Sequence, residues 1–272
     1  LVSVVLGVIL AFVFEPQPDW RHPHFTERAL YGVSVGVLLG GLAQLGIQLP
    51  RLWRLGFCFR WRLELGNERL RQVWRLAWPS MIAGAAVQVN VLVIGMLASE
   101  INGARSWLNY AFRLMQFPIG VFGVAVATVT LPAVARHHAR EDLAAVGRQV
   151  EESLRLALYL TIPAAVGLAV LAPEIIAVIY QRGRFTAQDT ALTAAALRAF
   201  AVGLAGYAAI KVLVPCFYAL DRRWRPLQVS LVGIGVNLVL SLVLVKVLGF
   251  GHVGLAATTA TVALVNFGQL AL

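Results

Sequence analysis

Apolar residues dominate eight long segments of the chain, and short polar stretches separate these segments. The segments cover approximately residues 1–14, 29–49, 77–98, 106–135, 154–172, 190–218, 226–248 and 253–272. An α-helix rises about 1.5 Å per residue, so about twenty apolar residues cross the ~30 Å hydrocarbon core of a bilayer. The pattern therefore predicts an all-α, polytopic membrane protein, a helical bundle of about eight transmembrane helices.

Composition agrees with a membrane protein. Hydrophobic residues make up 59% of the 272 residues and charged residues 13%, whereas a soluble domain contains about 25% charged residues. Every loop between the segments is shorter than thirty residues, which disfavours an enzyme with a globular catalytic domain and favours a transporter whose site lies between helices. The two cysteines and five histidines show no metal-ligand spacing, so neither a metal site nor a cofactor is expected.

The chain carries a net charge of +10, almost entirely from arginine. If the loop 50–76 is cytoplasmic, the alternation of the spans puts thirteen loop arginines on the cytoplasmic side and five on the other side. This excess agrees with the positive-inside rule. In that loop aromatic residues alternate with arginines, which predicts a short interfacial helix. A nucleic-acid site built from the same residues is the alternative, and the apolar composition argues against it. The aromatic residues are Trp53, Phe57, Phe59, Trp61 and Trp74.

Arg113 lies about two helical turns inside the segment 106–135. A charge at membrane depth costs roughly 2.5–3.5 kcal/mol on insertion scales, so this residue is a functional candidate. Asn109 and Gln116 lie at helical spacings from Arg113, which predicts one polar face lining a water-filled cavity. The alternatives are that Arg113 reaches the outer interface or pairs with a neighbouring helix. Pro118 is expected to kink this helix.

Two further cations, Lys211 and Arg198, lie within the segment 190–218. Their spacing puts them on different faces of a helix, so either can face the cavity while the other reaches an interface. No aspartate or glutamate lies well inside any segment. Cations without anionic partners indicate an anionic ligand, and a guanidinium fork matches the oxygens of a phosphate group.

The polar stretch 181–189 has the chemistry of a turn followed by a helix start. Gly183 is typical of the turn itself. Thr186 and Asp189 have the spacing of a capping box, which predicts that the next helix begins directly after Thr186.

Several stretches of the chain resemble the MurJ (MviN) lipid II flippase family. The longest, residues 109–132, reads NYAFRLMQFPIGVFGVAVATVTLP and resembles the family's signature. The others are QRGRFT at 181–186, KVLVPCFYA at 211–219, VNLVLS at 236–241, and Gln88 with Asn90 after Trp78-Pro79-Ser80. The chain departs from the family at Phe112, where the family commonly has an aspartate, so any salt bridge made by that aspartate is missing.

The resemblance implies part of a two-lobe, fourteen-helix transporter fold of the MOP superfamily. The eight segments then correspond to the fifth to twelfth helices of that fold. Residues 1–49 end the first lobe, residues 50–76 form a basic cytoplasmic linker, and residues 77–248 form the second lobe, which continues to residue 272. Both ends of the chain fall inside apolar runs, which is typical of a piece of a longer protein.

The resemblance also implies a flippase that moves lipid II, an undecaprenyl diphosphate bearing a disaccharide and a peptide, from the inner to the outer leaflet by alternating access. Arg113 then contacts the diphosphate, with Asn109 and Gln116 as polar neighbours and with Lys211 and Arg198 as further substrate-binding candidates. No enzymatic chemistry and no cofactor are implied, and the location is the bacterial inner membrane. The implied partners are lipid II, membrane lipids and cell-wall synthesis proteins.

Two other functions stay open on the sequence. One is a flippase for another polyprenyl-linked saccharide. The other is a non-transporting membrane scaffold that recruits cell-wall enzymes, for which the charge of Arg113 would have no role in transport.

Overall fold

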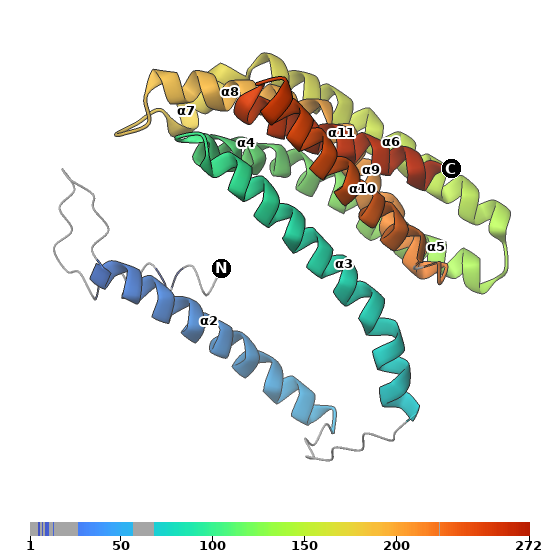
Figure 1. Cartoon of the computed structure of the whole chain (residues 1–272). Coiled ribbons are helices and arrows are strands. Elements are labelled where there is room, and N and C mark those ends of the chain that lie inside the picture. Colours follow the sequence, from blue (N-terminus) through green and yellow to red (C-terminus); the bar gives the residue numbers. More distant parts are fainter. Residues whose placement is uncertain are drawn as a thin grey trace. The chain divides into compact units, whose positions relative to one another are not determined.

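The computed structural model describes residues 27–56, 68–222 and 224–272, together with the isolated positions 5, 7, 9, 10 and 13. All regular secondary structure in these residues is helical, which confirms the predicted all-α class (Figure 1). The chain divides into two compact units, Leu1–Gly66 and Asn67–Leu272. The boundary falls inside the stretch 50–76, and the assignment of the units to transporter lobes stays a prediction.

The first unit contains helix α2, Glu27–Arg54. This helix covers the predicted segment 29–49 and continues beyond it into the basic stretch. Arg51 and Arg54 occupy its last turn, where a positive charge is stabilised by the negative end of the helix dipole.

The second unit is built from helices joined by short turns, in chain order. These are α3 Glu68–Ser99, α4 Ala104–Pro118, the π-helical turn η1 Ile119–Val124, α5 Ala125–Ala139, α6 Leu143–Val170, α7 Ala172–Tyr180, α8 Ala187–Val202, α9 Leu204–Ala219, α10 Trp224–Leu242, the π-helical turn η2 Val243–Val247, and α11 Gly251–Ala271.

Five helical stretches of the described residues are long and apolar enough to cross a membrane, and the bent pair α8–α9 makes a sixth. The predicted polytopic helical bundle is therefore confirmed. The predicted segment 77–98 falls within α3, where Gln88–Ser99 form a shorter apolar helix. Residues 57–67, which include part of the predicted interfacial helix, and most of the predicted segment 1–14 lie outside the described residues.

Helices α8 and α9 lie at the centre of the second unit. Helix α8 packs against α4, α7, α6 and α11, whereas α9 packs against α5, α6, α11 and η1. Leu197, Leu204 and Val212 on these two helices are completely buried. Each of the two helices also keeps an exposed side, which carries Arg198 on α8 and Lys211 on α9.

The segment 190–218 is bent, whereas the sequence predicts one uninterrupted span. Helices α8 and α9 meet at Gly203 with a change of direction of 47°. At this bend the chain packs closely against α11: a Cβ atom at Gly203 would lie 2.5 Å from the Cα of Ala260, and one at Gly206 would lie 2.8 Å from the carbonyl oxygen of Ala263. Small residues allow membrane helices to approach this closely.

The helix that carries Arg113 continues through Pro118, where the sequence predicts a kink, and its hydrogen-bonding pattern changes there. Residues Ala104–Ala139 form one helical stretch in which the π-helical turn η1 begins directly after Pro118. Proline has no N–H group, so one carbonyl of the preceding turn loses its usual partner. In a π-helical turn the hydrogen bonds span five residues, one more than in an α-helix, and the regular α-helix resumes after it. Such turns are frequent at functional sites.

The predicted turn and capping box before α8 are confirmed. Gly183 has a φ of +60°, a conformation that favours glycine. The Asp189 carboxylate accepts hydrogen bonds from the Thr186 backbone N–H (2.8 Å) and hydroxyl (2.7 Å), and the Thr186 hydroxyl accepts from the Asp189 N–H.

Replacing Gly203 with alanine is expected to destabilise the protein by about 1–3 kcal/mol, because the added methyl group meets the backbone of α11. The measurement is the midpoint of thermal unfolding of the purified full-length protein in detergent. Gly235→Ala is the matched control, since a Cβ atom at Gly235 has no other atom within 4 Å. Equal unfolding midpoints for the two variants would contradict the packing argument.

Candidate functional site

One face of α4 is polar and lies at the surface of the second unit. Asn109, Arg113 and Gln116 are separated by four and three residues, and all three side chains are exposed. The opposite face is buried, and Ala111 and Met115 have no accessible surface. The structure therefore places the three polar residues that the sequence predicts on one exposed face of α4.

The guanidinium group of Arg113 makes no hydrogen bond and no ion pair with any residue that the structure describes. Asn109 donates from Nδ2 to the backbone oxygen of Arg105 (3.2 Å), which holds its amide along the helix. Pairing of Arg113 with a neighbouring helix, one of the alternatives drawn from the sequence, is thus not found among the described residues. Its donors are available to a ligand or to water.

Phe112 explains how α4 is oriented. Its ring packs edge-on against Phe200 of α8 (centroids 5.6 Å apart) and Tyr207 of α9 (6.5 Å). The position where the related family commonly has an aspartate therefore makes an aromatic contact with the central helices. This contact fixes the buried face of α4 and leaves Arg113 on the opposite, exposed side without a carboxylate neighbour in the described part of the chain.

Lys211 lies beside the same long helix as Arg113. A Cβ atom at Gly123 in η1 would be 3.6 Å from the Lys211 Cβ and 3.3 Å from the Cα of Ala208. The Lys211 side chain is exposed. Gly123 follows Arg113 by ten residues, which is about 15 Å along the helix axis. Lys211, which lies next to Gly123, therefore adds a second cation at that distance from Arg113 along the helix.

Arg198 has a different neighbour. Its Nε–H donates to the backbone oxygen of Ala169 (3.2 Å), in the last turn of α6. Carbonyl groups in a last helical turn lack partners within the helix, so this contact satisfies one of them. The structure brings Lys211 to the helix of Arg113 and ties Arg198 to α6.

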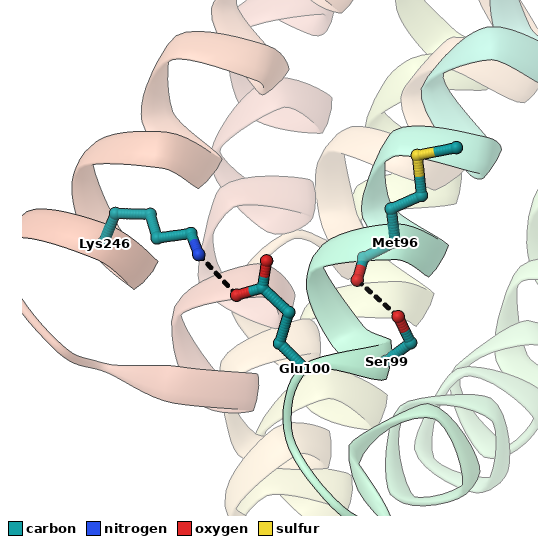
Figure 2. A network of polar contacts seen from close by, with 4 residues as sticks. All are labelled: Met96, Ser99, Glu100 and Lys246. Carbon is teal, nitrogen blue, oxygen red and sulfur yellow. Dashed lines mark hydrogen bonds and ion pairs between the residues drawn. The ribbon is translucent and has the colours of Figure 1, made fainter.

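An ion pair that the sequence does not predict joins two other helices. Figure 2 shows Glu100, directly after α3, paired with Lys246 in η2. The same view shows the Ser99 hydroxyl donating to the Met96 carbonyl oxygen (2.7 Å) in the last turn of α3. Both charged side chains are about half exposed, so the pair contributes little stability but restrains the end of α3 against η2.

Comparison with known proteins identifies the family. The family model described as "Lipid II flippase MurJ" matches residues 2–272. The chain belongs to this family. A probable lipid II flippase MurJ of Vibrio cholerae is 34% identical over 245 residues, which are 90% of this chain and 46% of that protein. One from Bdellovibrio bacteriovorus is 32% identical over 268 residues, which are 98% of this chain and 50% of that protein.

Solved structures show the same fold. A lipid II flippase MurJ in an inward closed conformation superposes with a TM-score of 0.76 at 22% identity, covering 99% of this chain and 53% of that one. An inward-facing multidrug transporter of the MATE family in the MOP superfamily gives 0.74 at 14% identity, covering 99% and 62%. The chain spans about half the length of the curated MurJ relatives that it matches. It is an integral membrane protein of the bacterial inner membrane.

Single cysteines on α4 are expected to show whether its polar face is hydrated. In a background with both cysteines of this sequence replaced, Cys58→Ala and Cys216→Ala, Asn109→Cys and Gln116→Cys should react with a charged, water-soluble thiol reagent in intact membranes, because water reaches a polar face. Met115→Cys, which is fully buried, is the matched control on the same helix and should stay unmodified.

The readout is the mass increase of the labelled full-length protein. Equal modification of Asn109→Cys and Met115→Cys, or no modification of Asn109→Cys and Gln116→Cys, would contradict a hydrated polar face.

Proposed function

We propose that the protein moves lipid II from the inner to the outer leaflet of the bacterial inner membrane. The observation that carries this proposal is an exposed arginine, Arg113, on a membrane-spanning helix, with no anionic partner among the described residues. Membership of the MurJ family supports lipid II as the substrate.

The chemistry of the substrate fits this site. The diphosphate and sugars of lipid II cannot enter hydrocarbon unaided, because a buried charge or unpaired polar group is costly there. A guanidinium group offers two parallel N–H donors to phosphate oxygens. Arg113 is proposed to bind the diphosphate, Asn109 and Gln116 to donate hydrogen bonds beside it, and Lys211 to add positive charge along the same helix. Arg198 remains a weaker candidate because it already donates to α6.

Transport is proposed to occur by alternating access. Rocking of two lobes would expose the polar face of α4 first to the cytoplasm and then to the outside, while the lipid tail stays in the bilayer. No bond of the substrate is made or broken in this process, so the protein is proposed to act as a transporter and not as an enzyme. It needs no cofactor for this role.

Substitution of Arg113 tests the proposal. Arg113→Ala in the full-length protein should slow lipid II translocation about 10- to 100-fold, since a hydrogen bond to a charged group contributes roughly 1.5–3 kcal/mol. Arg113→Lys keeps the charge but loses the bidentate geometry, so its rate should fall between those of the wild type and Arg113→Ala. Translocation is measured in cells as the fraction of lipid II that an added, membrane-impermeant hydrolase can cleave.

Arg155→Ala is the control, because Arg155 is an exposed arginine that pairs with Glu151 of its own helix (2.9 Å). It should translocate lipid II at the wild-type rate. Unchanged translocation by Arg113→Ala at normal expression would exclude Arg113 from the mechanism and would agree with a scaffold. Normal lipid II exposure in cells that lack the protein would instead indicate another saccharide carrier.

A further inference from the structure

A cavity of about 700 Å³ lies at the N-terminal end of α4, where it meets α7 and the turn before α8. We call it the aromatic pocket. Its volume falls in the range of pockets that hold small molecules, about 300–1,000 Å³. Its lining includes Trp107, Tyr110, Tyr180, Arg184, Phe185 and Asp189.

The walls of the pocket are aromatic rings that hold one another in place. Tyr110 of α4 lies against Tyr180 of α7 (centroids 4.7 Å apart) and against Phe185 in the turn (5.6 Å). Tyr180 and Phe185 are 6.1 Å apart. Such rigid rings offer large apolar faces with polar hydroxyl groups at their edges. This combination suits a sugar ring, which has apolar C–H faces and hydroxyl groups at its rim.

The pocket also has an excess of positive charge. Arg182 donates to the Ile179 carbonyl oxygen at the end of α7, whereas Arg184 makes no hydrogen bond or ion pair with any described residue. Both guanidinium groups are exposed. The pocket therefore presents donors for an anion, and a carboxylate or phosphate is the group that a guanidinium fork binds best.

The one carboxylate of the pocket is already occupied. Asp189 accepts from the Thr186 backbone and hydroxyl and from Trp107 Nε1–H (2.8 Å). These bonds hold Trp107 in the wall and satisfy Asp189, so this carboxylate does not pair with Arg184. A ligand carboxylate can therefore approach the free guanidinium.

The aromatic pocket lies on the same face of α4 as Arg113. Ser106, Tyr110 and Arg113 follow one another at spacings of four and three residues, which puts them on one side of the helix. Seven residues separate Ser106 from Arg113, or about 10 Å along the axis. A ligand bound at Arg113 through a diphosphate could therefore extend its sugars and peptide toward the pocket.

We propose that the aromatic pocket is a second binding site that takes a sugar bearing a peptide with a free carboxylate. The rings stack on the sugar, and Arg184 binds the carboxylate. We take the natural ligand to be the head group of lipid II, and this choice rests on the proposed function. The class of ligand follows from the rings and the free guanidinium group of the pocket itself. A phosphate from a lipid head group would use Arg184 but would leave the aromatic walls without a partner.

The probe is N-acetylmuramyl dipeptide, which carries a sugar and a peptide carboxylate but neither diphosphate nor lipid tail. Binding is measured by calorimetric titration of the full-length protein in phosphatidylcholine nanodiscs. The Kd should rise about tenfold in Arg184→Gln, since one hydrogen bond to a charged group is lost. It should be unchanged in Arg140→Gln, which replaces an exposed arginine outside the pocket. Arg184 is exposed in a turn, and equal unfolding temperatures would show that its variant is folded.

Three results would overturn the proposal: no binding of the probe by the wild type, equal affinity of the wild type and Arg184→Gln, or loss of probe binding when the nanodiscs contain phosphatidylglycerol. The last result would assign the pocket to lipid phosphate. If the probe binds at Arg184 but the cells expose lipid II normally without the protein, the pocket stands and only the proposed function fails.

Discussion

The cost of keeping an arginine charge at membrane depth is the constraint on which this structure depends. Arg113 lies on a helix that is long and apolar enough to span a bilayer, yet it has no partner among the described residues. A cost of roughly 2.5–3.5 kcal/mol is tolerated only where water or an anion reaches the charge. The neighbouring amides of Asn109 and Gln116 extend the polar surface, and this extension favours a hydrated site over a contact with lipid.

The rest of the second unit keeps this face turned outward. Ala111 and Met115 are fully buried on the opposite side of α4, and Phe112 packs against the bend between α8 and α9. A rotation that took Arg113 into the bundle would expose these apolar groups and bury an unpaired charge, and both changes are unfavourable. Phe200 and Tyr207, which lie on either side of the bend at Gly203, therefore support the site from behind.

The helical spans and the polar face of α4 could be predicted from the sequence because hydrophobic periodicity is a local signal. Helix α6 begins eleven residues before the predicted segment, since Asp142 caps it (2.9 Å to the Ala145 N–H) and its first turns are polar. The contact of Arg198 with α6 and the bond from Trp107 to Asp189, 82 residues away, depend on tertiary packing. No local pattern reveals such pairs, and for this reason the aromatic pocket was not predicted.

Native mass spectrometry of the full-length protein with undecaprenyl diphosphate and undecaprenol gives the most direct test of a diphosphate-binding Arg113. The two lipids share a tail and differ only in the charged group. The wild type should retain the diphosphate lipid preferentially, and Arg113→Gln should lose most of this preference while still binding both tails. An unchanged preference in Arg113→Gln would show that the diphosphate is held elsewhere.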